Sequence, residues 1–251
     1  MISRFVVLLT IALTVIGLFA YTLRSSPGAS ASPQELTVIS RTRGGEVLTA
    51  DFLDNQIRVH LKNNHKDTIT AFAINFGNTV VKEDFAYSEI HFGIEPGETF
   101  EESYPFSRSS PGAELPTVNL LTVLLKGSTN DGDPKVAQQI KDERLGEKIQ
   151  IHRMLKVLEK EGFSRKDIKA LKGDITAALD AGEDEARIIR KELVPASAMD
   201  DNLSENLKKG LHWGREKMLR RFQTLEQLPT DRQDEGLIEL QDRARKLFSK
   251  L

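Results

Sequence analysis

The sequence of 251 residues contains no cysteine. This absence excludes a disulfide framework, a thiolate zinc site and a cysteine nucleophile. A domain outside the cytoplasm that has no disulfide depends on its hydrophobic core alone. An exported chain of this composition is more typical of a bacterial envelope than of an animal secretion.

The sequence also lacks a strong charge of either sign, because 35 Lys and Arg residues nearly balance 37 Asp and Glu residues, for a net charge of −2. Domains that bind nucleic acid usually carry a strongly basic surface. We therefore expect no nucleic-acid partner. A hydrophobic content of 39% and a charged content of 29% are ordinary for a globular body.

Motifs of catalysis are missing as well. The sequence has no G-x-S-x-G, no glycine-rich phosphate loop and no H-E-x-x-H. We therefore predict no catalytic residue and expect that the protein is not an enzyme. The alternative is a hydrolase or a metal-dependent enzyme whose carboxylates or histidines converge only in three dimensions.

Metal-ligand spacings are absent too. His60 is predicted on the polar side of a strand, His65 in the following turn and His91 at the end of a later strand. Three imidazoles near one another bind zinc, but the usual ligand spacing is missing here. The loop 130–133 lacks the alternating acidic order and the closing glutamate of a calcium loop. We expect no metal and no cofactor.

What the sequence does contain is an uncharged apolar run over residues 5–21, directly after Arg4. A helix of about 20 apolar residues crosses the hydrocarbon core of a membrane. The run is therefore predicted to be a retained signal-anchor or a signal peptide, with the small residues Ala29-Ser30-Ala31 as a cleavage site in the second case. The membrane is thus a predicted partner, and most of the chain is expected outside the cytoplasm, in a bacterial cell envelope.

The composition changes along the chain predict four parts. Residues 24–33 are rich in Ser, Pro, Gly and Ala, which bury too little surface to fold alone. The expected parts are a signal segment at 1–23, a flexible linker at 24–33, a β-sandwich domain at 34–129 and a helical region at 130–251.

Residues 34–126 alternate between apolar and polar side chains in short runs separated by turn residues, which indicates strands. Six or seven strands at this spacing are typical of an antiparallel sandwich of the immunoglobulin or fibronectin III type. Gly44-Gly45 suits a tight hairpin. The remaining predicted strands are listed by range: 35–42, 46–52, 57–62, 69–76, 85–94, 98–104 and 117–125.

From Pro134 onward the apolar period changes to that of helices, and each helix has one apolar and one charged face. Pro134 suits the first helical position, and Ser204 suits the cap of a later helix. The segment 161–168 is similar to the start of some DNA-binding helices, but capping alone accounts for its serine and aspartate. The predicted helical stretches are listed by range: 136–158, 164–179, 183–193, 204–225 and 230–251.

Trp213 is the one candidate site residue. It lies about 140° around its helix from the stripe that contains Leu207 and Leu225, so one packed face does not bury both. Either a second helix covers Trp213, or the residue belongs to a partner surface, where tryptophan often anchors binding. Gly210 and Gly214 permit the close approach of a neighbouring helix, which favours the first alternative. The predicted partner is a protein.

Three stretches of sequence carry a resemblance to known proteins: Ile57 to Phe72, Ile94 to Glu98 and Gly132 to Lys148. Together they resemble a family of uncharacterised exported proteins of soil bacteria, in which an apolar start precedes a β-sandwich and charged helices. The resemblance covers residues 34–158. It implies an exported location and this order of domains, and it implies no activity and no site residue.

Overall fold

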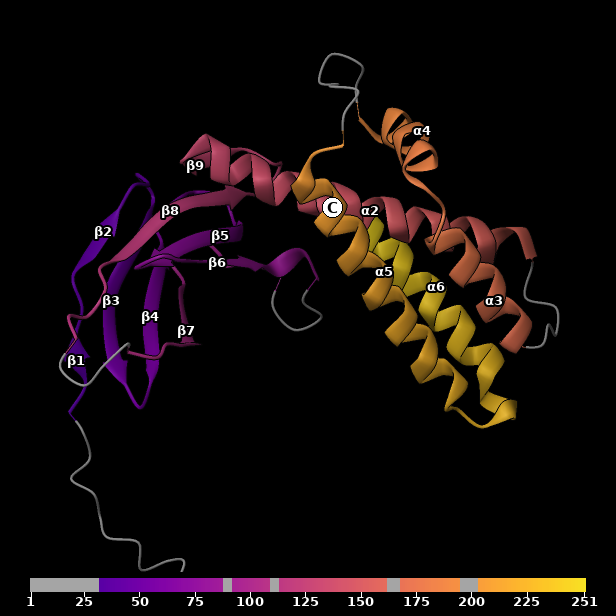
Figure 1. The fold of residues 1–251 in the computed structure, drawn as a ribbon, viewed down its shortest axis with the longest axis horizontal. Helices are drawn as coiled ribbons and strands as arrows, with labels where there is room; N and C mark the ends of the chain where they lie inside the picture. The colour runs from indigo at the N-terminus through magenta and orange to yellow at the C-terminus, as the bar shows by residue number, and fades with distance from the viewer. Residues whose placement is uncertain (1–31, 88–91, 109–112, 162–167, 195–202) are drawn as a thin grey trace, which may run out of the picture.

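The computed structural model describes residues 32–87, 92–108, 113–161, 168–194 and 203–251. Nine strands precede five helices within this part of the chain. The strands gather at one end of the molecule and most of the helices at the other (Figure 1). The predicted N-terminal apolar segment lies outside the described residues, and no helix among the described residues is long and apolar enough to cross a membrane.

The first sheet is antiparallel throughout and has the strand order β1-β3-β4-β7. Alternation positions its core residues, since Ile57, Val59 and Leu61 of β4 are buried while their neighbours are not. Asp54 and Asn55, with φ of 51° and 60°, connect β3 to β4 in a two-residue turn. The bounds are β1 Gln34–Glu35, β3 Gly45–Leu53, β4 Gln56–Asn63 and β7 Thr99–Pro105.

The second sheet has the strand order β2-β8-β5-β6, with β9 also paired to β8. The pairing of β2 with β8 is parallel, so the expectation of a wholly antiparallel fold was wrong. The chain leaves the first sheet after β1 and joins the second without reversing its direction. The bounds are β2 Val38–Ser40, β5 Ile69–Phe76, β6 Thr79–Asp84, β8 Val118–Leu125 and β9 Asn130–Gly132.

The two sheets enclose one hydrophobic core. Phe72, Ile74 and Phe76 of β5 are buried in it, as the alternation predicts. The strand β8 is apolar on both faces because it lies inside its sheet and is covered on both sides, which confirms the prediction of a central strand.

The predicted hairpin at Gly44-Gly45 was wrong. The flanking strands β2 and β3 belong to different sheets. The connecting loop is held by the Asp131 carboxylate of β9, which accepts the backbone N–H groups of Arg43 at 2.6 Å and Gly44 at 3.0 Å. A contact between residues so far apart in the sequence is invisible to a local turn preference.

The predicted strand at 85–94 was also wrong over its first residues. Residues Phe85–Tyr87 form a 3-10 turn, η1, and residues 88–91 lie outside the described part. The Asp84 carboxylate accepts the backbone N–H of Ala86 at 3.0 Å, which ends the preceding strand. That strand, β6, was not predicted at all.

The longest helix, α2, contacts both halves of the molecule. It spans Pro134–Glu161, and the Asp133 carboxylate caps its start by accepting the backbone N–H of Lys135 at 2.9 Å. Pro134 occupies the first helical position, as predicted. Ala137 and Ile140, near the start of α2, pack on the outer face of the second sheet, and the residues from Ile151 onward join the helical core.

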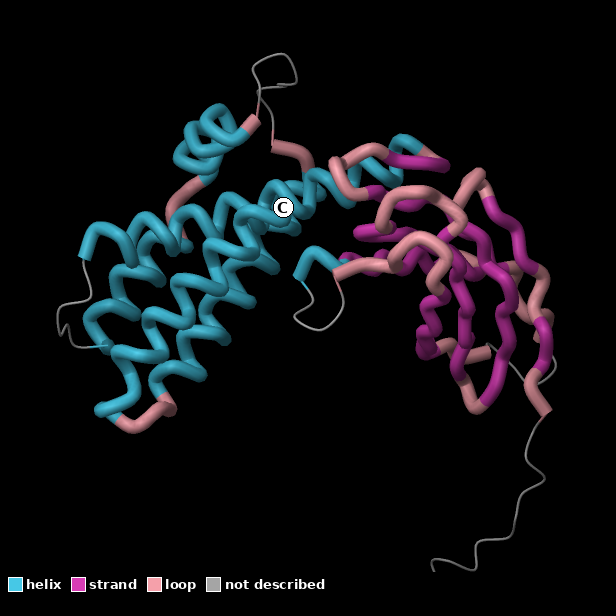
Figure 2. The backbone as a smooth tube through the Cα atoms, turned by 180° about the vertical axis from the view of Figure 1, so that it is seen from behind, coloured by secondary structure: helices cyan, strands magenta, loops and turns pink. Residues whose placement is uncertain are grey.

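Helices α3, α5 and α6 form a bundle along the second half of α2 (Figure 2), and α4 packs separately on α2 and the start of α5 through Ala186 and Ile189. Ser204 caps α5 by accepting the Leu207 N–H, as predicted. The stripe of α5 is buried at Leu207, Met218, Phe222 and Leu225. The bounds are α3 Ile168–Leu179, α4 Glu183–Leu193, α5 Glu205–Glu226, η3 Thr230–Arg232 and α6 Gln233–Lys250.

Candidate functional site

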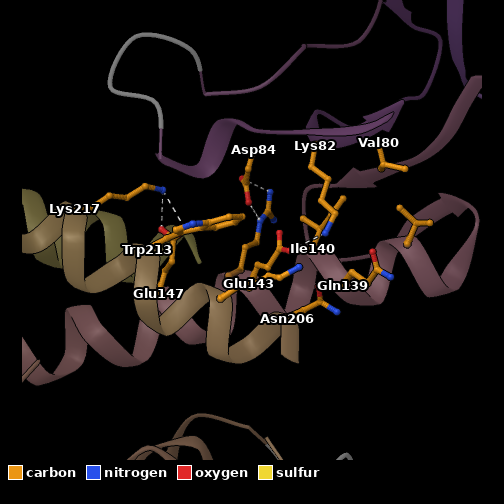
Figure 3. A pocket seen from close by; sticks show the side chains of 13 residues that line it. Val80, Lys82, Asp84, Gln139, Ile140, Glu143, Glu147, Asn206, Trp213 and Lys217 are labelled. Carbon is orange, nitrogen blue, oxygen red and sulfur yellow. Dashed lines mark hydrogen bonds and ion pairs between the residues drawn. The ribbon is translucent and has the colours of Figure 1, made fainter. Parts of the chain in front are cut away.

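A groove of about 700 Å³ lies between the edge strand β6 and the helices α2 and α5 (Figure 3). Its walls therefore come from both halves of the molecule. The lining residues are Val80, Lys82 and Asp84 of β6, Val136, Gln139, Ile140, Glu143, Arg144 and Glu147 of α2, and Asn206, Lys209, Trp213 and Lys217 of α5.

Two ion pairs connect β6 to α2 across the bottom of the groove. Lys82 Nζ lies 2.7 Å from Glu143 Oε1, and Arg144 Nη2 lies 2.7 Å from Asp84 Oδ1. Alternate residues of a strand share a face, so Lys82 and Asp84 both point toward the helix. Glu143 and Arg144, which are adjacent on α2, thus bind Lys82 and Asp84, which lie on the same face of β6.

Arg144 is the most constrained cation of the groove. Its guanidinium donates to both carboxylate oxygens of Asp84, at 2.8 and 2.7 Å, and to the backbone carbonyl of Thr70 at 2.8 Å. The residue is only 8% exposed. Such a bidentate, buried pair has a defined geometry. It therefore sets the position of β6 and the neighbouring β5 relative to α2.

Helices α2 and α5 meet at three glycines. A methyl group at Gly146 of α2 would lie 2.3 Å from the Leu207 carbonyl oxygen, and one at Gly210 of α5 would lie 2.0 Å from the Glu143 carbonyl oxygen. Gly214, one turn later, faces Glu147 in the same way. The backbones therefore approach more closely than any side chain permits, as the prediction for Gly210 and Gly214 requires.

A third ion pair follows this helix crossing. Lys217 Nζ lies 3.0 Å from Glu147 Oε2, and the Glu147 carboxylate is buried. Each of the three carboxylates that line the groove, on Asp84, Glu143 and Glu147, therefore has a cation beside it.

The structure places Trp213 on the α5 wall of this groove, with 45% of its surface exposed. No described helix covers it fully. Val80, on the opposite wall, is 50% exposed. Lys209, one helical turn before Trp213, is exposed and has no ion pair or hydrogen bond with the described part of the chain. Apolar surface thus lies on both walls of the groove, at Trp213 and Val80, and one available cation lies beside Trp213 on the α5 wall.

Of the histidines considered for a metal, the structure describes His60 and His65, and each lies beside a different acidic residue. His60 lies 3.6 Å from Glu101, and His65 lies 3.1 Å from Asp131. His91 lies outside the described residues. Among the residues that the structure describes, no group of three or more His, Asp or Glu side chains is arranged to hold a metal ion.

The other face of β6 carries a proton-sensitive contact with β7. Burial, together with the negative charges of Glu102 and Asp84, raises the pKa of Glu83 above its ordinary value. Burial and the Glu83 charge likewise raise the pKa of Tyr104. Burial therefore makes the Glu83 carboxyl easier to protonate in the folded chain than in water.

Sequence reasoning missed most of this groove. Only Trp213, Gly210 and Gly214 were singled out, because a tryptophan off the apolar stripe and two glycines one turn apart are local signals. The pairs from β6 to α2 join residues about 60 positions apart. No spacing in the sequence marks them.

The fold and groove define a protein class in structural terms: a two-sheet β domain joined by one long helix to a helical bundle. Comparison of the chain with protein-family models, with curated proteins and with solved structures finds no significant match.

Proposed function

We propose that the protein is a non-catalytic interaction module of a bacterial cell envelope, and that the groove containing Trp213 is its partner surface. The observation that carries the proposal is the half-exposed indole of Trp213 inside a preformed groove. Tryptophan is enriched among the residues that dominate binding energy at protein interfaces. The partner is a protein.

The shape of the groove supports this proposal. Its walls are joined by the ion pairs of Lys82 and Arg144, so little ordering is needed when a partner enters. A preorganised surface loses less entropy on binding than a mobile one. Trp213 and Val80 add exposed apolar surface bordered by charged groups, which is the usual pattern of an interaction site.

The alternative, a hydrolase or a metal-dependent enzyme, requires a carboxylate free to bind a metal or accept a proton. The carboxylates that line the groove, on Asp84, Glu143 and Glu147, each have a cation within 3.0 Å. This arrangement suits a rigid binding surface better than a reactive one. We therefore place the enzymatic function second.

We further propose an immunoglobulin-like topology for the β domain and an envelope location for the whole chain. The N-terminal stretch of the β domain pairs first with one sheet, as β1, and then with the other, as β2. This division between the two sheets supports the immunoglobulin-like topology. The apolar run at 5–21 and the resemblance to exported proteins of soil bacteria support the envelope location.

The test is site-specific crosslinking of the full chain in living bacteria that carry it. A photoreactive phenylalanine analogue replaces Gln139 in the groove or, as the control, Ile238 on the exposed side of α6. We expect a discrete protein adduct from position 139 only, and we expect Trp213→Ala to remove it. The same adducts from both positions, or an adduct from position 139 that survives Trp213→Ala, would contradict the proposal.

A further inference from the structure

The strand β6 has an open edge in the groove. Within the described residues, β5 is its only hydrogen-bonded neighbour. Gly77, with φ of 60°, and Asn78 form the two-residue loop between the paired residues Phe76 and Thr79. The N–H of Thr79 therefore points back to β5, as in any such turn. The N–H and C=O groups of successive strand residues point to opposite sides of the strand. Those of Val80, the next residue, therefore point to the open edge.

This edge lacks the usual protection against pairing with another strand. Proteins protect edges with proline, bulges or charged side chains that project across them. The pairing of β5 with β6 has no bulge, and β6 has no proline. Lys82 and Asp84 are charged, but their side chains are held on α2 by ion pairs.

The neighbouring edge strand shows the contrast. In the first sheet, β7 is the strand at the same side of the domain, and it carries the exposed Glu102 and ends at Pro105. These are the protective features that β6 lacks. The two edges therefore differ in their readiness to accept a further strand.

The α5 wall matches an extended peptide in spacing. Figure 3 shows the labelled residues of β6, α2 and α5 following one another in the same direction along the groove. Lys209 and Trp213 are four residues apart on α5, which is about 6 Å along a helix. Alternate residues of an extended chain are about 6.6 Å apart. Neighbouring side chains on one face of an added strand therefore match the spacing of these two residues.

Charge decides which side chains fit. The groove is lined by four cationic and three anionic side chains. Three ion pairs use all the anions and leave Lys209 as the cation without a partner in the described structure. An acidic side chain complements Lys209, and a large apolar one complements Trp213.

We propose that the partner enters as an extended peptide segment that pairs with the open edge of β6 as an additional strand. The segment carries an acidic residue at one position and a large apolar residue two positions away, facing Lys209 and Trp213. This inference rests on the proposed function and names its class of partner. Main-chain pairing supplies general affinity in such strand addition, and the alternate side chains supply specificity.

The experiment uses a phage-displayed library of random dodecapeptides and the immobilised full chain in detergent micelles. We expect enrichment of peptides with Asp or Glu two positions from Phe, Trp, Leu or Ile. Enrichment of no motif beyond that obtained on the Trp213→Ala chain would overturn the inference.

An enriched peptide is then synthesised with backbone N-methyl groups, and its affinity is measured by fluorescence anisotropy. Methylation of alternate residues blocks one edge of an extended peptide. We expect one set of alternate positions to weaken binding by about tenfold or more and the other set to leave it nearly unchanged, because only one edge faces β6. Equal affinity of both methylated forms and the parent peptide would overturn strand addition.

Charge and aromatic variants test the α5 wall. Lys209→Glu is expected to change the selected acidic residue to Lys or Arg, whereas Lys246→Glu, the same change on the exposed side of α6, is expected to leave the motif unchanged. Trp213→Ala is expected to weaken binding about thirtyfold, and Ile238→Ala, an exposed apolar control, to have no such effect. An unchanged motif with Lys209→Glu would overturn the assignment of the acidic position.

The outcomes separate the two proposals. An adduct at position 139 in cells, combined with a peptide that tolerates both N-methylation patterns, leaves the groove as a partner surface and removes strand addition alone. The absence of both adduct and peptide removes both proposals.

Discussion

Gly210 is the residue at which helix α5 comes nearest to α2. Any side chain there meets the backbone of Glu143, since a methyl group would lie 2.0 Å from its carbonyl oxygen. Backbone atoms do not move aside as the end of a flexible side chain does. The helices must therefore separate, and with them the α2 and α5 walls of the groove.

We expect Gly210→Ala to lower the free energy of unfolding by about 3 kcal/mol, at the upper end of overpacking effects. Gly173→Ala in α3 is the matched control, because nothing lies near a methyl group there. That change is expected to raise the free energy of unfolding by about 0.5–1 kcal/mol through helix propensity. Urea unfolding of residues 32–251 measures both, and equal effects of the two substitutions would refute this account of the crossing.

Glu83 gives a residue-scale prediction on pH. Its pKa is raised in the folded state, chiefly by burial. A raised pKa means that the folded state holds the proton more tightly than the unfolded state. The contribution of Glu83 to stability is therefore fully present below its ordinary pKa and is lost as the pH rises through the folded value.

Glu83→Gln keeps the side chain neutral at every pH. We expect it to raise the melting temperature at about pH 7 and to leave it nearly unchanged at about pH 4, where the glutamate is itself protonated. Glu35→Gln, on an exposed carboxylate of β1, is the control and is expected to change neither value appreciably. A loss of stability with Glu83→Gln at about pH 7 would show that the folded state favours the charged form.

At the scale of elements, the bidentate pair between Arg144 and Asp84 is one of two ion pairs that attach β6 to α2. Arg144 and Asp84 are joined by two hydrogen bonds at 2.7 and 2.8 Å. Removal of one partner leaves the other charge buried without its counter-ion, which costs about 3–5 kcal/mol. The second sheet then loses part of its attachment to the long helix.

We expect Arg144→Met and Asp84→Asn each to destabilise the fold by about 3 kcal/mol, and the double variant by about 1–3 kcal/mol less than their sum. Arg187→Met removes exposed ion pairs of α4 with Glu183 and Asp184 and is expected to cost less than about 1 kcal/mol. Urea unfolding of residues 32–251 measures all four variants. Strict additivity of Arg144→Met and Asp84→Asn would mean that the pair does not act as a unit.

The elements also show where sequence reasoning succeeded. The helix α4, Glu183–Leu193, was predicted at its observed bounds, because acidic residues begin it and the apolar period is regular. The strand β6 was missed because three of its six residues are charged, which is typical of a loop. Its charges become compatible with a strand only once α2 and β7 lie beside it, and neither element is near it in the sequence.

At the scale of the whole molecule, the long helix α2 connects a β domain to a helical bundle, and the groove lies where the two meet. Because the continuous helix α2 joins the two parts, the distance between the walls of the groove is fixed. The proposed partner segment therefore meets a preformed trough bounded by an open strand edge and by Lys209 and Trp213.

The apolar run at 5–21 supplies the prediction at this scale. We expect the full chain to remain with the membrane fraction through a high-pH carbonate wash, because transfer of this run to hydrocarbon is favourable. Deletion of residues 2–23 is expected to release the chain, whereas deletion of residues 24–31 leaves the run intact and is expected to preserve membrane association. Protease added to spheroplasts is expected to digest the region 32–251, and full protection of that region would contradict export.

The sequence by itself determined the order of β and α parts, most of the element bounds, the helix start at Pro134 and the helix cap at Ser204. These features follow from side-chain periodicity and from local backbone chemistry, which act over a few residues. Only the tertiary structure decided that β2 joins the second sheet in parallel, that β6 forms an open edge, and that Trp213 lies half exposed opposite that edge. Each depends on contacts between residues tens of positions apart, and the energy of such contacts exists only when the chain is folded.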